Sequence, residues 1–213
     1  MNYKTICQES ENKQCTAADE VAHTLLPPAV GRTPAERAEI FNWALIPFPN
    51  GLTYKRIPRT LRDQASKQER EWGNRVIGKQ NNSNWSGTMG ELAVYEALMM
   101  KGKNPRKPSK RDHCEPDWET DECIYEVKTS NWTVPGTAGE KVLGTMYKYS
   151  DVPELYGKPL KIVCVAYQEW ELTNGRTKIF GDISPRKQAY LDLAMSQGVE
   201  YVKFSDLVSG LNY

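Results

Sequence analysis

The sequence lacks the long apolar stretches that membrane proteins need. Its longest run without a charged, polar, glycine or proline residue is Ile162 to Tyr167, far short of the ~20 apolar residues of a spanning helix. The first ten residues are polar and hold no apolar segment typical of a secretory signal. The five cysteines are odd in number and follow no framework spacing, which is typical of free thiols in a reducing compartment. We therefore expect a cytoplasmic, intracellular protein without a membrane partner.

Histidine and net charge are also scarce. Only His23 and His113 are present, so three-histidine zinc catalysis and most histidine-based nuclease mechanisms lack their residues. Lys and Arg number 28 against 27 Asp and Glu, and this balance gives no overall attraction to nucleic acid or membrane. A chain of 213 residues that is 39% hydrophobic suits one sizeable domain.

The charges are unevenly distributed along the chain. Residues 53–80 carry eight Lys or Arg against three acids, and residues 101–111 carry six with no acid. Residues 112–126 then hold seven acids and no Lys or Arg. Because neighbouring acids repel one another unless cations or a bound metal offset them, this acidic block is the first candidate for a functional site.

The hydrophobic pattern predicts an α/β fold. Thr33, Pro34 and Glu36 form a capping-box pattern that predicts a helix to about Ala44, and residues 60–75 and 89–100 are also typical of helices. Beyond residue 112 the period changes, and Cys123 to Thr129 alternates as a strand does. Further strands are predicted at 117–119, 160–167 and 178–183, and further helices over 140–149 and from Ser184-Pro185.

Three charged side chains on the predicted strands could converge. Glu126 and Lys128 are two residues apart on one strand, so they leave the same face about 6.5 to 7 Å apart. A turn at residues 120–122 would fold Asp117 back beside them. Two carboxylates beside an ammonium suit Mg²⁺ and phosphoryl chemistry, because this ion prefers oxygen ligands. The alternatives are a simple cross-strand ion pair for Glu126 and Lys128 and a turn role for Asp117.

This arrangement resembles the PD-(D/E)xK nuclease superfamily, whose motif is matched by Pro116-Asp117 followed by Glu126-Val127-Lys128. The helix that contains Gly90-Glu91 adds to the resemblance, since an upstream helix of this family often donates another acid. The resemblance covers about residues 87–167. It implies a restriction-endonuclease-like core, in which helices flank a mixed central sheet, together with a mainly helical N-terminal region.

The resemblance also implies roles for these residues. Asp117, Glu126 and the Val127 carbonyl would hold Mg²⁺, and Glu91 would reach it directly, through water, or at a second ion. Lys128 would orient the attacking water and stabilise charge on the phosphate. The products would carry 5′-phosphate and 3′-hydroxyl ends. A Glu in a first helical turn is also common for dipole reasons alone, which is the alternative for Glu91.

The DNA contacts are predicted close to the motif. Ser130, Asn131 and Lys141 flank a glycine-containing segment that could contact phosphates, and Asn84 and Trp85 could read bases or stack on them. A phosphate loop of the nucleotide-binding kind is excluded, because the required Gly-Lys-Ser/Thr is absent around Lys141. No nucleotide cofactor is therefore expected. An ordinary polar loop and helix entry are the alternatives.

The segment after the motif, from Thr129 to Lys148, together with Tyr149 to Cys164, resembles small type II restriction endonucleases. We therefore expect a Mg²⁺-dependent enzyme of this kind that cuts double-stranded DNA at a short site as a homodimer, with one active centre for each strand. Residues 1–213 would form a single nuclease domain, in which 1–82 serve recognition or dimerisation and 83–213 form the catalytic core. Three alternatives stay open: a structure-selective nuclease such as a junction resolvase or a recombination or repair nuclease, a non-catalytic DNA-binding module, and an α/β protein with a coincidental motif.

Overall fold

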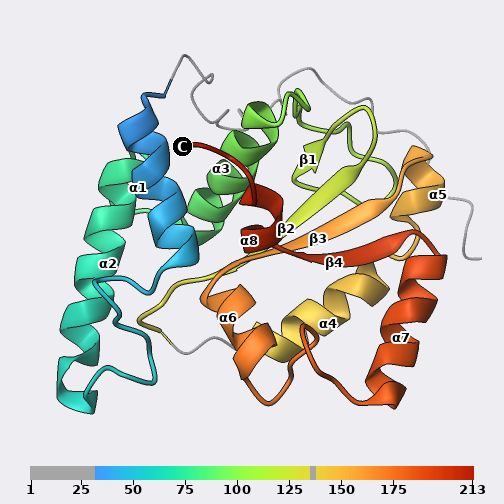
Figure 1. The fold of residues 1–213 in the computed structure, drawn as a ribbon. Coiled ribbons are helices and arrows are strands. Elements are labelled where there is room, and N and C mark those ends of the chain that lie inside the picture. Colours follow the sequence, from blue (N-terminus) through green and yellow to red (C-terminus); the bar gives the residue numbers. More distant parts are fainter. Residues whose placement is uncertain (1–31, 135–137) are drawn as a thin grey trace, which may run out of the picture. The chain divides into compact units, whose positions relative to one another are not determined.

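A mixed four-stranded sheet lies at the centre of the computed structural model, which describes residues 32–134 and 138–213 (Figure 1). The strands lie side by side in chain order: β1 (Trp118–Glu119), β2 (Ile124–Ser130), β3 (Leu160–Ala166) and β4 (Val199–Lys203). β1 runs antiparallel to β2, whereas β2, β3 and β4 are parallel. The mixed α/β class predicted from the sequence is confirmed.

The helices occupy most of the remaining described chain. Their bounds are α1 (Pro34–Leu45), α2 (Arg62–Val76) after a short 3₁₀ turn η1 (Arg59–Leu61), α3 (Trp85–Met100), α4 (Ala138–Lys148), α5 (Val152–Tyr156), α6 (Tyr167–Asn174), α7 (Pro185–Ser196) and α8 (Phe204–Val208). The predicted capping box begins α1: Thr33 Oγ1 accepts from Glu36 N–H at 3.3 Å, and Glu36 Oε2 accepts from Thr33 N–H at 2.8 Å. The short helices α5, α6 and α8 were not predicted.

The strand predicted at residues 178–183 is wrong. This segment is a loop between α6 and α7, in which the N–H groups of Ile179 and Phe180 both donate to the Leu172 carbonyl. Ile179 is buried against Val142 and Cys164, so its apolar character serves packing rather than strand pairing. The strand that pairs with the free side of β3 is β4 instead, and β1 and β4 form the two edges of the sheet.

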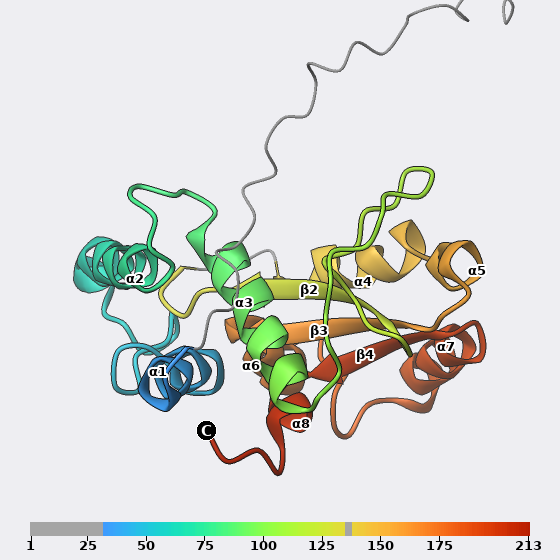
Figure 2. The ribbon, with the colours of Figure 1, turned by 90° about the horizontal axis from the view of Figure 1, so that it is seen from above.

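Helices cover both faces of the sheet (Figures 1 and 2). α3 lies against one face of β2, and Gly90 allows the close approach, since a Cβ there would stand 1.8 Å from Thr129 Oγ1. α4, α6 and α7 lie against the other face. Side chains of Ile124 to Val127 alternate between the two faces of the sheet. All four residues are buried, because helices cover both faces.

The N-terminal helices α1 and α2 pack against α3 rather than forming a separate body. Residues 32–213 form one compact unit. The predicted recognition region begins with residues 1–31, which lie outside the described residues. None of the described helices is both long and apolar enough to cross a membrane.

Candidate active site

Asp117 and Glu126 face each other across the β1–β2 turn. The antiparallel register pairs Trp118 with Tyr125, and its continuation by one residue sets Asp117 opposite Glu126. The two side chains therefore leave the same side of the sheet as close neighbours. Asp117 Oδ2 accepts a hydrogen bond from Val127 N–H at 2.6 Å. The Asp117 carboxylate, rather than a main-chain carbonyl of the neighbouring strand, therefore accepts from this N–H of β2.

Lys128 completes this group. Its ammonium donates to Glu126 Oε1, and its side chain is 30% exposed against 5% for Glu126. The other oxygen, Glu126 Oε2, is buried and makes no hydrogen bond of normal geometry among the described residues, although the Tyr149 hydroxyl interacts with this carboxyl. Most buried carboxylate oxygens in folded proteins are hydrogen-bonded, so an oxygen without a well-formed bond is a candidate ligand.

Electrostatics make this pair of acids costly to ionise together. Burial, followed by the charges of Glu126 and Glu91, raises the pKa of Asp117 from 3.8 to about 7. Burial also raises the pKa of Glu126, although Lys128 and Lys148 oppose the effect. Both carboxyls therefore gain from any cation that joins them.

Glu91 stands near Asp117 but already has a cation. Its Oε2 lies 3.1 Å from Lys107 Nζ, which also sits 4.2 Å from the ring centre of Trp118. The Trp118 indole in turn donates to the Glu91 carbonyl at 2.9 Å. Lys107 was not singled out from the sequence, and its place in a basic segment was the only signal for it.

A tyrosine and a second lysine lie on the α4 side of the same acids. Tyr149 is buried, and burial together with the Glu126 and Asp117 charges raises the pKa of its hydroxyl. Lys148 Nζ donates to that hydroxyl at 3.3 Å. Neither residue has a function predicted from the sequence, and only the fold brings them to Glu126.

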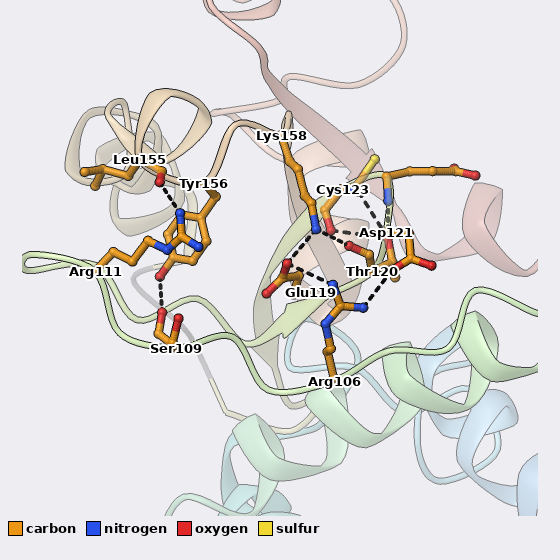
Figure 3. Close-up of polar contacts among 11 residues, drawn as sticks. Arg106, Ser109, Arg111, Glu119, Thr120, Asp121, Cys123, Leu155, Tyr156 and Lys158 are labelled. Atoms are coloured by element: carbon orange, nitrogen blue, oxygen red, sulfur yellow. Dashed lines mark hydrogen bonds and ion pairs between the residues drawn. The ribbon is translucent and has the colours of Figure 1, made fainter.

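Most of the remaining acids in residues 112–126 have structural partners (Figure 3). Glu119 pairs with Lys158 at 2.5 Å and with Arg106 at 3.1 Å, and Arg106 also pairs with Asp121 at 2.9 Å. These pairs tie the β1 turn to the segments before it and after α5. Cations of the chain, rather than a metal, thus offset this part of the acidic block.

The same close-up shows how the long segment before β1 is held (Figure 3). Arg111 Nη1 donates to the Leu155 carbonyl at 2.5 Å, and the Tyr156 hydroxyl donates to the Ser109 carbonyl at 2.8 Å. The guanidinium of Arg111 also lies 4.7 Å from the ring centre of Tyr156. The loop that leads to Asp117 is therefore fastened to α5.

The residues predicted to contact DNA fall into different environments. Trp85 is buried and packs on Trp43 and on Gly73 of α2, so the expectation of an accessible ring for base stacking is wrong. Asn84 and Lys141 are exposed. Ser130 and Asn131 are partly exposed at the end of β2, but the Asn131 amide donates to Glu69 Oε2 at 3.4 Å.

Glu69 is the most heavily bonded carboxylate near the site. It is fully buried on α2 and accepts from Trp43, Asn131, Trp132 and Thr133, the last through both its N–H and its hydroxyl. The segment that follows β2 is thereby fixed to the N-terminal helices. No local sequence pattern predicts this contact, since the partners lie 26 to 64 residues away.

Comparison with protein families, with curated proteins and with solved structures finds no match to this chain. Among the described residues, no group of three or more His, Cys, Asp or Glu side chains is placed to hold a metal ion. A metal site here would have to rest on Asp117 and Glu126 together with main-chain oxygen and solvent. The arrangement itself is two neighbouring carboxyls, an ammonium beside them and a buried carboxylate oxygen without a well-formed hydrogen bond among the described residues.

Proposed function

We propose that this protein is a Mg²⁺-dependent endonuclease that hydrolyses phosphodiester bonds of double-stranded DNA. One observation carries the proposal: the convergence of Asp117, Glu126 and Lys128, with Glu126 Oε2 buried and without a hydrogen bond of normal geometry among the described residues. That combination fits a hard divalent cation, since this oxygen would gain a partner and the repulsion between the acids would be offset.

The residues of the chain then have distinct tasks. Asp117 and Glu126 would hold the ion with the Val127 carbonyl, and Glu91 would support it from α3. When bound, Mg²⁺ supplies positive charge that stabilises a phosphate under attack. Lys128 is partly exposed, so its ammonium can turn from Glu126 to orient a water molecule and to stabilise charge on a phosphate oxygen. The products would carry 5′-phosphate and 3′-hydroxyl ends.

We further propose that the enzyme acts as a type II restriction endonuclease on short specific sequences. A two-fold homodimer would give each strand its own catalytic group and would match a palindromic site. An intracellular location fits the free thiols of Cys114, Cys123 and Cys164.

Digestion of plasmid DNA with Mg²⁺ tests this proposal. We expect discrete fragments whose sequenced ends share one motif, and no cleavage when a chelator is added. Cleavage of branched or nicked DNA alone would instead indicate a structure-selective nuclease of the same chemistry. No cleavage of any DNA with Mg²⁺ or Mn²⁺ by the folded protein would contradict the proposal.

A further inference from the structure

A polar groove of about 420 Å³ lies at the carboxyl end of α2. Three cationic side chains line it, together with one acid and three amides: Arg70, Arg75, Lys79, Glu71, Asn74, Gln80 and Asn81. The sequence predicts the basic segments 53–79 and 101–111 as walls of a phosphate-lined cleft, and Arg70, Arg75 and Lys79 belong to the first of them. Asn81 belongs to the polar loop whose amides could read bases. DNA contacts are also predicted a few residues further on, at Asn84 and Trp85, and Trp85 proves to be buried.

The groove carries an excess of positive charge. Glu71 is engaged by Lys67 at 3.8 Å, and Arg75 reaches Glu39 at 3.5 Å. Within the described ranges, no carboxylate pairs with Arg70 or Lys79. Such cations attract a polyanion, and salt weakens the attraction.

The loop that borders the groove is held in place by the backbone. Gly78 has φ +68°, a left-handed conformation that suits glycine. Its N–H donates to the Arg75 carbonyl and that of Lys79 to the Asn74 carbonyl, a pair of bonds that ends α2 with a Schellman motif. Asn74 adds a side-chain bond, because its Oδ1 accepts from Asn82 N–H at 2.9 Å. Lys79 is therefore presented from a fixed loop, which lowers the entropy lost on binding.

Two basic loops flank β2, the strand that contains Glu126. In Figure 2 the loop from α2 to α3 and the long loop from α3 to β1 extend toward the same side, one on each side of β2. The first loop contains Lys79, and the second contains Lys107, Lys110 and Arg111. A duplex lying across β2 would meet cations on both sides of the scissile phosphate.

We propose that the α2 groove binds the phosphate backbone of the DNA duplex that is cut at Asp117 and Glu126, through Arg70 and Lys79. This inference rests on the proposed function and deepens it, because it assigns a DNA-contact surface. Phosphate contacts fix the register of a duplex without reading its sequence. The groove therefore contributes affinity and position rather than choice of site.

Binding is measured in an Asp117→Asn background, which prevents cleavage, by fluorescence anisotropy of a short labelled duplex over a range of salt concentrations. We expect the Arg70→Ala/Lys79→Ala pair to weaken binding similarly for all sequences. Each phosphate contact contributes about 0.9 to the slope of log affinity against log salt, so the slope should become shallower by about 2.

The matched control is Arg186→Ala/Lys187→Ala, which removes the same charge from two exposed residues of α7. We expect its salt slope to equal that of the background. An unchanged slope for the groove variant, or an equal change in both variants, overturns the inference while plasmid cleavage by the wild type still supports the nuclease. If the wild type neither binds nor cuts DNA, the proposed function fails as well. Arg70 is exposed and Lys79 partly exposed, and a thermal melt verifies that the variant folds.

Discussion

Two buried glutamates near β2 differ in how their oxygens are used. Glu69 accepts hydrogen bonds on both oxygens, from two N–H groups of the main chain, two side-chain N–H groups and one hydroxyl. Glu126 has Lys128 on one oxygen and no hydrogen bond of normal geometry on the other within the described chain, with the Tyr149 hydroxyl beside the carboxyl. Burial raises the pKa of both carboxyls.

Glu69 is therefore a structural carboxylate, whereas Glu126 keeps an oxygen that a ligand could bind. A buried polar group that is fully bonded helps to specify one conformation, whereas an unsatisfied one costs free energy until something binds it. Glu69 joins α1 and α2 to the segment after β2, and Glu126 sits at the centre of the proposed site. Substitutions that remove the same charge should therefore act on stability at one position and on ligand binding and activity at the other.

The largest expected effect is on activity. Asp117→Asn and Lys128→Ala should each reduce DNA cleavage by about 10³-fold or more, because each removes a charge that acts on the phosphate or on the ion. Initial rates on plasmid DNA measure the loss. Circular dichroism should find both variants folded. Near-normal rates in both variants would exclude these residues from catalysis.

The next effect is on stability. Glu69→Gln keeps the side chain's shape but turns an amide NH₂ toward groups that already donate, so the free energy of unfolding should fall by about 3 kcal/mol. Urea denaturation measures this change. Glu126→Gln is the matched control, and it should change stability by less than about 1 kcal/mol, because the amide oxygen can still accept from Lys128. Equal losses at the two positions would remove the distinction between them.

The sequence was informative where interactions are local. The capping box of Thr33, the strand at Ile124–Ser130 and the approach of Asp117 to Glu126 through a short turn depend on residues within about ten positions of one another. Motif spacing and periodicity report such contacts.

Contacts between distant segments could not be predicted in this way. Trp85 appeared available for stacking because it follows a polar loop, but Trp43, Trp72 and Gly73 enclose its ring. Glu69 lies in a very polar helix and would pass for an exposed residue. The surroundings of Trp85 and Glu69 both depend on how α1, α2 and α3 pack together. Periodicity and motif spacing in a single sequence do not report that packing.

The pH dependence of stability tests the proposed site at Asp117, the neighbour of Glu126. The pKa of this carboxyl is about 7 in the folded protein against 3.8 ordinarily, so between these values the folded state keeps a proton that the unfolded state has released. The free energy of unfolding should therefore fall as pH rises from about 4 to about 7, by at most about 1.4 kcal/mol per pH unit.

Urea titrations at a series of pH values, without metal, measure this fall. Asp117→Asn should lack this part of the pH dependence. Addition of Mg²⁺ above pH 7 should restore stability in the wild type, because binding to the folded state alone stabilises it. An identical pH profile in the wild type and the variant would mean that Asp117 titrates normally.

The smallest effect is expected at an exposed carboxylate with good geometry. Glu122 lies 2.8 Å from Lys103, but the side chains are 66% and 36% exposed. Water solvates both charges in either state, so Glu122→Gln should alter the free energy of unfolding by no more than about 0.5 kcal/mol, and less at high salt. Urea midpoints at low and high salt measure the difference. A loss as large as that of Glu69→Gln would show that distance alone sets the value of these contacts, whereas a negligible loss assigns the value of Glu69 to burial and to its number of donors.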